Sequence, residues 1–334
     1  MSNQKIDFVV TWVNQNDEEW LNKKKRYEND NLKGDNTVQR YRDWGLFKYW
    51  FRCVEKNAPW VNRIFLITDK QVPAWINLDN KKIKIINHEE ILEREKLPTF
   101  NSNAIEFGIG NIKELSEYFV YFNDDVFITR KIKPKDFFKN GNPVDNFGLN
   151  IIRSYDGEIG ESVLNDMKIV NRIIPKKNLK TSTKIKMFSP KNGPLLIKTL
   201  LLAPFNHFCA FYDSHSAIAF RKSFFLNIQK KFSAEVEKTQ DNRFRQKDDI
   251  SIWVIRYLYE ALGEFAVRNN LHFSKYMEPT SDNIRIIEKM VKNPKYKLLC
   301  INDSQRCNSN IEENSKLIKK AFEARYSEKS SFEI

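Results

Sequence analysis

Short apolar runs separated by helix-length segments are the feature that most restricts how this chain can fold. Four of these runs are rich in β-branched and aromatic residues, and each ends in a polar or turn-forming stretch, which predicts strands. The predicted strands are residues 6–13, 63–68, 83–86 and 118–122. Between residues 46 and 54 the apolar side chains recur at helical spacing instead. Strands that alternate with helices favour a mainly parallel α/β sheet covered by helices on both faces.

Three regions of different character follow one another along the 334 residues. Residues 1–142 carry the alternating strand and helix pattern. Residues 143–204 are rich in lysine and show little sustained periodicity, which indicates an insertion or a mobile subdomain. Residues 205–334 return to helical order and contain a late strand at 297–301. The length suits one large α/β domain with such an insertion.

The chain is strongly basic, with 56 lysines and arginines against 43 acidic residues and a net charge of +13. This surplus attracts polyanions, which include nucleic acids, anionic lipid head groups and phosphorylated substrates. The charge is scattered along the sequence, and no recognised nucleic-acid-binding module accompanies it. We therefore expect no nucleic-acid partner.

The cysteines and the apolar runs indicate where the protein works. Four cysteines form no CxxC pair and no regular framework, which disfavours a disulfide scaffold or a zinc ribbon and fits the reducing cytoplasm. No secretory signal precedes the first predicted strand. The run 195–205 is interrupted by Lys198 and Pro204 and is too short to cross a bilayer. We expect a protein that is soluble or peripheral at a membrane.

The Asn123-Asp124-Asp125 turn follows the fourth predicted strand and is the sharpest local signal for chemistry. Residues two apart on a strand share a face, so Asn123 and Asp125 are expected to point together and Asp124 to point away. Paired oxygen donors at a strand end suit Mg²⁺, which takes one or two carboxylates and completes its shell with phosphate and water. On this fragment alone, an Asx-rich turn that merely ends a strand is an equal alternative.

His215 and two arginine clusters are the other candidates for catalysis. His215 has the residue type of a general base for a sugar hydroxyl, although a lone histidine is more often structural. The arginines within 40–42 and 243–245 suit phosphate oxygens and charge on a transferring phosphoryl group, although a single arginine is more often a surface ion pair. The motifs GxxxxGK[ST], GxGxxG, GxSxG and HExxH are absent, which disfavours ATP binding, NAD binding, serine hydrolysis and zinc hydrolysis.

Four blocks of sequence resemble the Stealth family of sugar-1-phosphate transferases, which includes bacterial capsule phosphotransferases and the catalytic part of the lysosomal-enzyme GlcNAc-1-phosphotransferase. The blocks are residues 6–20 (IDFVVTWVNQNDEEW), 40–128 (from RYRD through LPTFNSNAIE to YFNDDVFI), 215–245 and 298–304 (LLCINDS). They cover most of the chain outside the lysine-rich insertion. Gln15 stands where many relatives carry glycine and Ala217 where a proline often follows the histidine, which leaves the local loop geometry open.

The resemblance implies a GT-A-like nucleotide-sugar fold in residues 1–142, with residues 205–334 completing the active site. It implies substrate ligands, metal ligands for Mg²⁺ or Mn²⁺, and catalytic residues. The implied substrate ligands are Asp7, Thr11, Trp12, Asn14, Arg40, Arg42 and Asn302. The implied metal ligands are Asn123, Asp124, Asp125 and Asp303, and the implied catalytic residues are Asp125, His215 and Arg245.

The implied reaction is attack of an acceptor hydroxyl on the β-phosphorus of a UDP-hexose, with UMP leaving and His215 or Asp125 taking the proton. The expected acceptor is a lipid-linked oligosaccharide or polysaccharide at the cytoplasmic membrane face, in bacterial surface polysaccharide synthesis. The lysines of residues 176–186 would touch anionic lipid there or form a solvated loop. The alternative is a conventional glycosyltransferase of the same fold, which attacks the sugar C1 and releases UDP.

Overall fold

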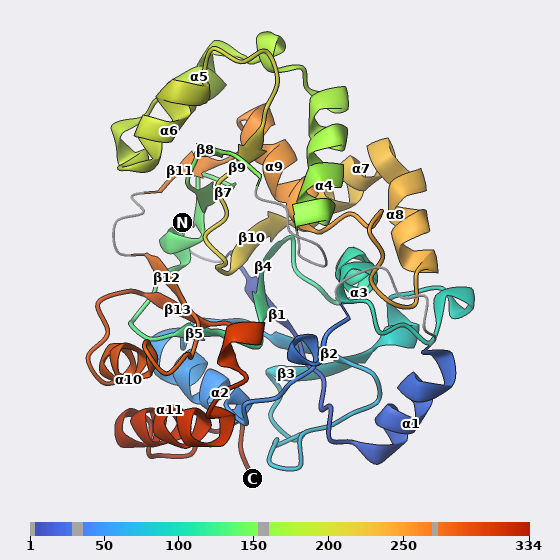
Figure 1. The fold of residues 1–334 in the computed structure, drawn as a ribbon, viewed down its shortest axis with the longest axis vertical. Helices are drawn as coiled ribbons and strands as arrows, with labels where there is room; N and C mark the ends of the chain where they lie inside the picture. Colours follow the sequence, from blue (N-terminus) through green and yellow to red (C-terminus); the bar gives the residue numbers. More distant parts are fainter. Residues whose placement is uncertain (1–3, 29–35, 153–159, 269–272) are drawn as a thin grey trace.

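The computed structural model of the chain describes residues 4–28, 36–152, 160–268 and 273–334. Its centre is a five-stranded sheet in the order β10-β4-β1-β2-β3, in which β10 alone pairs antiparallel (Figure 1). The strands are β1 Ile6–Thr11, β2 Ile64–Thr68, β3 Ile83–Asn87, β4 Tyr118–Asn123 and β10 Ile218–Arg221. The four strands predicted from the apolar runs are all present, and the mainly parallel α/β fold with flanking helices is confirmed.

Alternate side chains of the central strands enter two separate cores, because successive residues of a strand point to opposite faces. Phe8 and Val10 of β1 belong to one core, and Val9 belongs to the other. The first core is covered by α2 Phe47–Asn57, α10 Ile284–Lys292 and α11 Ile311–Arg325. The second is covered by α3 Ser102–Phe107, α4 Gly160–Ile173, α7 Lys222–Gln229, α8 Ser233–Asp241 and α9 Trp253–Leu262. The result is a three-layered helix, sheet and helix arrangement.

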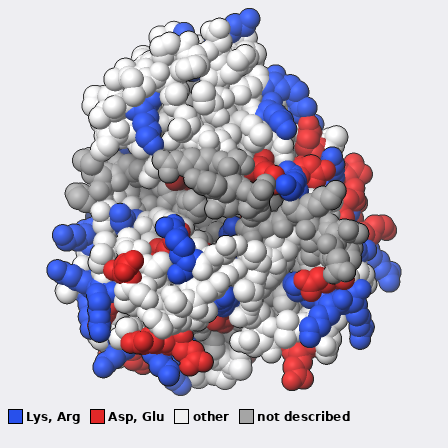
Figure 2. Space-filling model, in the orientation of Figure 1, with Lys and Arg blue, Asp and Glu red and all other residues white. Residues whose placement is uncertain are grey.

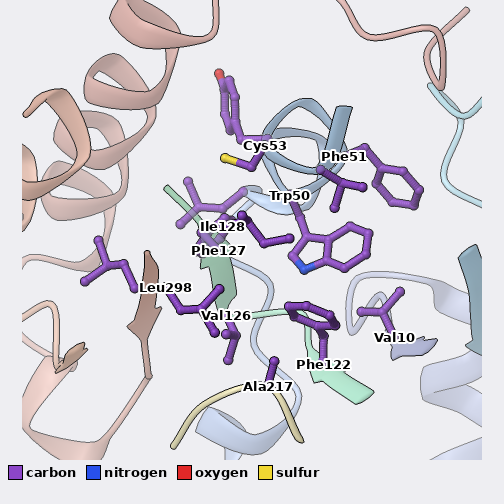
Figure 3. Close-up of a cluster of buried hydrophobic side chains, with 14 of the residues drawn as sticks. Val10, Trp50, Phe51, Cys53, Phe122, Val126, Phe127, Ile128, Ala217 and Leu298 are labelled. Atoms are coloured by element: carbon purple, nitrogen blue, oxygen red, sulfur yellow. The ribbon is translucent and has the colours of Figure 1, made fainter. Parts of the chain in front are cut away.

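The Asn123–Asp125 turn connects the central sheet to a second sheet, in the order β12-β13-β5. Phe122 before the turn and Val126 after it are both buried in the core beneath α2, where the ring of Phe122 lies 5.5 Å from Trp50 (Figure 3). Buried side chains therefore fix the turn from both ends, which holds its polar groups on a rigid support.

Smaller elements complete the fold. The strands of the second sheet are β5 Val126–Ile128, β12 Ser274–Met277 and β13 Leu298–Ile301. The remaining short strands are β6 Phe138–Lys139, β7 Asn142–Asp145, β8 Leu149–Asn150, β9 Ala210–Phe211 and β11 Ala266–Val267. The first helix, α1 Glu18–Tyr27, begins at the N-cap Asp17, whose carboxylate accepts the N–H of Trp20 at 2.8 Å. Trp20 in turn packs on Phe100.

Residues 160–204 carry more regular structure than their sequence pattern indicates. They contain α4 and two shorter helices, α5 Thr181–Met187 and α6 Leu195–Leu202. Two of their lysines are structural. Lys176 Nζ donates to the carbonyls of residues 202, 203 and 205 after α6, at 2.7 to 3.0 Å, and Lys186 Nζ donates to the carbonyls of residues 263 and 265 after α9. Lysines at these places satisfy carbonyls that a helix end leaves unpaired.

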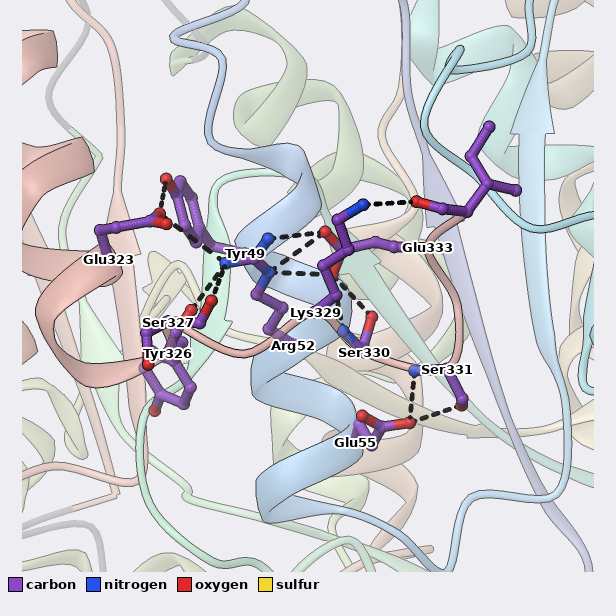
Figure 4. Close-up of polar contacts among 11 residues, drawn as sticks. Tyr49, Arg52, Glu55, Glu323, Tyr326, Ser327, Lys329, Ser330, Ser331 and Glu333 are labelled. Carbon is purple, nitrogen blue, oxygen red and sulfur yellow. Dashed lines mark hydrogen bonds and ion pairs between the residues drawn. The ribbon is translucent and has the colours of Figure 1, made fainter.

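Residues 326–334 cross α2 and are held there by a polar network (Figure 4). Arg52 of α2 donates to the Glu333 carboxylate from Nε at 2.8 Å and from Nη2 at 2.7 Å, and from Nη1 to the carbonyl of Tyr326 at 2.7 Å. Burial opposes ionisation of Glu333, but the hydrogen bonds from Arg52 hold its pKa below the ordinary value. This buried ion pair joins α2 to a segment that is distant in sequence.

Candidate active site

A cavity of about 220 Å³ lies at the carboxyl ends of the parallel strands. Each of these strands delivers residues to it. They are Thr11 and Trp12 from β1, Asp69 after β2, His88 after β3, and Asn123 to Asp125 after β4. Ligands of open α/β sheets collect at this edge, so the cavity is a candidate ligand site.

Most of the residues predicted for the site line this cavity together. They are Thr11, Trp12, Arg40, Arg42, Asn123, Asp124, Asp125, Arg245, Asn302 and Asp303. The predicted residues that do not line the cavity are Asp7, Asn14 and His215.

Asp7, which was expected to bind substrate, is used structurally instead, whereas Asn14, also outside the cavity lining, has its backbone paired with Gln71. Asp7 is buried near the amino end of β1, at the opposite edge of the sheet, where its carboxylate accepts hydrogen bonds from Asn62 Nδ2 at 2.6 Å and from the Ser116 N–H at 2.7 Å. It thereby ties down the loops that lead into β2 and β4. The backbone N–H of Asn14 donates to Gln71 Oε1 at 2.8 Å, and Gln71 Nε2 donates back to the Asn14 carbonyl at 3.0 Å. This pair joins the loops after β1 and β2.

Asp124 and Asp125 both face the cavity, which corrects the expectation that Asp124 points away. The alternation of side chains stops because β4 ends at Asn123. Burial raises the pKa of both carboxyl groups, and the neighbouring Asp125 raises that of Asp124 further, to well above its ordinary range. At Asp125 the nearby charge of His215 counteracts part of the rise.

The turn fits a divalent cation that a substrate helps to hold. Asp125 Oδ1 is buried, and nothing within the described ranges forms a hydrogen bond with it. A cation would also neutralise the negative charge of the two adjoining carboxylates, whose burial otherwise favours their protonated forms. No three His, Cys, Asp or Glu side chains of the described residues are grouped as a complete metal site, but Mg²⁺ commonly takes only one or two carboxylates. Asp124 and Asp125, with Asn123 beside them, are the residues that would hold it.

Asp303, which was predicted to be a metal ligand, lines the cavity and has an arginine as its partner. Its carboxylate forms an ion pair with Arg42, whose Nη1 lies 3.1 Å from Asp303 Oδ2. Arg42 Nη2 also donates to Asn308 Oδ1 at 2.9 Å. Asp303 therefore orients the Arg42 guanidinium at the cavity wall.

Three arginines give the cavity a positive side. They are Arg40, Arg42 and Arg245. Arg245 Nη2 donates to Ser102 Oγ at 2.5 Å, which holds its guanidinium beside α3. Guanidinium groups bind phosphate oxygens through paired hydrogen bonds, so this side suits an anionic ligand.

His215 lies beside the cavity, in the loop between β9 and β10. Its backbone is in the left-handed region, with φ of 42°. Its ring lies 4.7 Å from the ring of Tyr276 and 5.4 Å from that of Trp253. The Tyr276 hydroxyl accepts a hydrogen bond at 3.0 Å from Asn302, which does line the cavity. The imidazole therefore stands one side chain away from the wall, within electrostatic reach of Asp125.

Glu106 is a candidate catalytic residue that the sequence reasoning missed. It lies on α3, lines the cavity, and is buried, which raises its pKa to about 7 even though it accepts a hydrogen bond from the Tyr121 hydroxyl at 2.9 Å. Tyr121 is bonded in turn to Thr11 Oγ1 at 3.1 Å. A carboxyl group that titrates near neutrality exchanges protons readily. One sequence feature does point to Glu106, because it is the single charged residue between positions 96 and 113.

We expect Glu106→Gln to remove part of the pH dependence of stability. The folded chain keeps the Glu106 proton up to a pKa of about 7, whereas the unfolded chain releases it near 4.5. Unfolding between these values releases a proton, so raising the pH lowers the free energy of unfolding, by about 2 kcal/mol from about pH 5 to about pH 7.5. Between the two pH values, the free energy of unfolding of the variant, measured by urea denaturation, should fall by about 2 kcal/mol less than that of the wild type. Equal losses in the two proteins would contradict the assignment.

Comparison with known proteins gives matches over almost the whole chain. Three conserved regions of Stealth proteins match, CR1 over residues 4–32, CR2 over 40–145 and CR3 over 214–261. The capsular polysaccharide phosphotransferase WcwK of Streptococcus pneumoniae is 41% identical over 332 residues, which cover 99% of this chain and 98% of that protein. The exopolysaccharide phosphotransferase cps2G of Lactiplantibacillus plantarum is 37% identical, over 98% of this chain and 96% of that protein.

A third relative is the receptor polysaccharide phosphotransferase WefC of Streptococcus gordonii, which is 37% identical over 99% of each chain. Among solved structures, the galactosyltransferase LgtC in complex with donor and acceptor sugar analogues aligns with 94% of this chain and 95% of that chain. The sequence identity is 11% and the TM-score is 0.40.

Proposed function

Because the chain belongs to the Stealth protein family, we propose that it transfers a hexose-1-phosphate from a UDP-hexose to a hydroxyl of a lipid-linked glycan and releases UMP. The relatives named as capsular and exopolysaccharide phosphotransferases support phosphotransfer in polysaccharide biosynthesis. The observation that carries the proposal is one cavity that is lined both by Asp124 and Asp125 and by the three arginines. Carboxylates and guanidinium groups around one cavity are what a phosphorylated substrate bound with a divalent cation requires.

The rest of the cavity wall supports a donor that carries a base and a sugar. Trp12 stacks on Phe47 with ring centroids 5.5 Å apart and an angle of 8° between the planes. Trp12 Nε1 and Gln39 Oε1 are buried, and neither has a hydrogen-bond partner in the part of the chain that the structure describes. Unpaired buried polar groups are costly, so a ligand that offers an acceptor to the first and a donor to the second binds more tightly. Uridine and hexose groups offer both.

In the proposed reaction the acceptor oxygen bonds to the β-phosphorus as the bond to the bridging oxygen of UMP breaks. Arg40, Arg42 and Arg245 hold the phosphate oxygens and stabilise the negative charge that develops there. A divalent cation held by Asp124 and Asp125 would supply further charge neutralisation on the pyrophosphate.

The acceptor proton passes to a base near the cavity, and we assign this role to His215. His88 also reaches the cavity, but burial lowers the pKa of its imidazole to about 4 and makes it a weak base at neutral pH. Asp125 is better placed to hold the cation, since its Oδ1 has no hydrogen-bond partner among the described residues. Glu106 lines the cavity beside Tyr121 and Thr11, where it can assist proton movement.

The nucleotide product tests the proposal. The protein is incubated with a UDP-hexose, Mg²⁺ and a glycan acceptor, and the nucleotides are separated by ion-exchange chromatography. We expect UMP to appear in proportion to transferred sugar phosphate, and a reaction without acceptor corrects for hydrolysis of the donor. A conventional glycosyltransferase attacks the sugar C1 and leaves UDP, so sugar transfer accompanied by UDP would contradict the phosphotransferase function.

A lipid-linked acceptor would require the protein to work at the cytoplasmic face of the membrane. No helix in the described ranges has the length and apolar character needed to cross a bilayer. We therefore propose peripheral contact with the membrane as the way in which the protein reaches its acceptor.

A further inference from the structure

Helix α6 exposes apolar side chains of a kind that a surface helix of a water-soluble protein normally buries. Its one buried residue is Thr199, whereas Ile197, Leu200 and Leu201 are 66%, 55% and 71% exposed. Thr199 Oγ1 accepts the N–H of Leu149 in β8 at 3.0 Å. A helix at a protein surface normally buries its apolar stripe. The Thr199 hydrogen bond and the partly buried Leu202 attach α6 to the fold, whereas Ile197, Leu200 and Leu201, at positions i, i+3 and i+4, face outward.

Further exposed apolar residues lie on or next to α5 and α6. Ile185 and Phe188 at the end of α5 and Phe205 after α6 are also exposed. Asn192 fixes the connection between the two helices, because its Nδ2 donates to the carbonyls of residues 186 and 187 and its Oδ1 accepts the N–H of Phe147 at 3.0 Å. The apolar face is the set Ile185, Phe188, Ile197, Leu200, Leu201 and Phe205. Exposed apolar groupings on rigid elements mark interaction surfaces.

The chain around the apolar face contains no acidic residue. Residues 167–212 include nine lysines and arginines and neither aspartate nor glutamate, although the chain has 43 acidic residues in all. Five of these lysines are exposed on or next to α5 and α6, and they are Lys177, Lys180, Lys184, Lys191 and Lys198. In Figure 2 the lobe that contains α5 and α6 is mostly white with some blue and no red, whereas both colours mix over the rest of the view.

We propose that the α5–α6 surface docks the protein on an anionic lipid bilayer, with the apolar face inserted between head groups and the five lysines among the lipid phosphates. An apolar face bordered by basic residues is the composition of surfaces that lie in a membrane interface. A second copy of the chain fits less well, because a symmetric contact would bring two positively charged faces together. The surface is attached to β8 and α9 at one end of the molecule, away from α11 (Figure 1). Its use rests on the proposed function, since it would bring the cavity to a lipid-linked acceptor.

Sedimentation with vesicles tests the docking independently of catalysis. The wild-type protein should bind vesicles of phosphatidylcholine with about one third phosphatidylglycerol, bind pure phosphatidylcholine weakly, and dissociate as salt is raised. Ile197→Ser with Leu201→Ser, and separately Lys180→Glu with Lys184→Glu, should each lower the partition coefficient by about tenfold or more.

Matched controls make the same kinds of substitution at exposed positions outside α5 and α6. Val72→Ser with Ile286→Ser replaces apolar residues that are exposed elsewhere, and Lys81→Glu with Lys113→Glu reverses two other exposed lysines. Both controls should bind as the wild type does. Absence of wild-type binding to the anionic vesicles, or equal binding by all variants, would overturn the proposal.

Two further measurements separate the alternatives. A wild-type dimer in size-exclusion chromatography that Ile197→Ser with Leu201→Ser converts to a monomer, without vesicle binding, would assign the surface to self-association and overturn the proposal. With a water-soluble acceptor, the same variant should release UMP at the wild-type rate. Failure of the wild type to release UMP while it still binds vesicles would refute the proposed function and leave the docking surface in place.

Discussion

Asp125→Asn is expected to abolish transfer while leaving the fold intact. Asp125 faces the cavity with an unpartnered Oδ1 among the described residues, so the substitution removes half of the carboxylate pair that would hold the cation. Loss of one preorganised electrostatic group typically costs a hundredfold to a thousandfold in kcat, and we expect about a thousandfold here because binding of the cation fails as well. Stability should not fall, since burial already disfavours the charged form of Asp125 and an amide is neutral.

The comparison needs both kcat and the melting temperature. Asp79→Asn is the matched control, because Asp79 is exposed and does not line the cavity, and it should retain wild-type activity and stability. Activity of Asp125→Asn would be measured over a range of Mg²⁺ concentrations. A variant that is fully active and still depends on the metal would exclude Asp125 from any essential role.

Replacement of His215 is expected to produce the second largest loss, about a hundredfold to ten-thousandfold in kcat, which is the usual contribution of a general base. The backbone at His215 is left-handed, so alanine would add strain to the loss of the imidazole. Asparagine tolerates this region, and His215→Asn therefore separates the two effects. Both variants should be compared by their kcat and by the dependence of kcat on pH.

A matched control is His207→Asn, because His207 is exposed and lies outside the cavity. It should leave kcat unchanged with a water-soluble acceptor. A large loss in His215→Ala together with normal kcat in His215→Asn would mean that His215 maintains the conformation of the loop and is not the base. Normal kcat in both variants would move the base to Asp125 or Glu106, which line the cavity directly.

The place of the cavity could be predicted because it depends on local patterns. Apolar runs that end in polar residues locate the carboxyl ends of parallel strands, and these ends share one edge of the sheet. Residues 123–125 followed from this alone, whereas Thr11 came from the family resemblance. The arginines came from their phosphate chemistry and the family resemblance, and they also line the cavity.

Some of the differences arise where a side chain is bound by a partner distant in sequence. Asp7 hydrogen-bonds to Ser116, 109 positions away, and Lys186 to the carbonyl of Phe265, 79 positions away. The lysine-rich stretch was therefore predicted to be an insertion or a mobile subdomain, although Lys176 and Lys186 bind carbonyls at the ends of α6 and α9. The side chain of Asp124 was predicted to point away from the site, because the sequence does not show at which residue the strand ends. Glu106 was missed because its helix was predicted from the spacing of apolar residues. Its carboxyl group has a pKa near neutrality because it is buried, and the sequence does not show this burial.

The bond between Arg52 and Glu333 has a consequence for the order in which the chain folds during synthesis. The two residues are 281 positions apart, so Arg52 emerges from the ribosome long before its partner exists. A guanidinium that is buried without a partner is strongly unfavourable, which delays the final packing of α2 until residues 326–333 have been made. Leu46 and Phe47, where α2 begins, form part of the cavity wall. An incomplete nascent chain therefore lacks a finished cavity, and the competence to bind a ligand there arises late in translation.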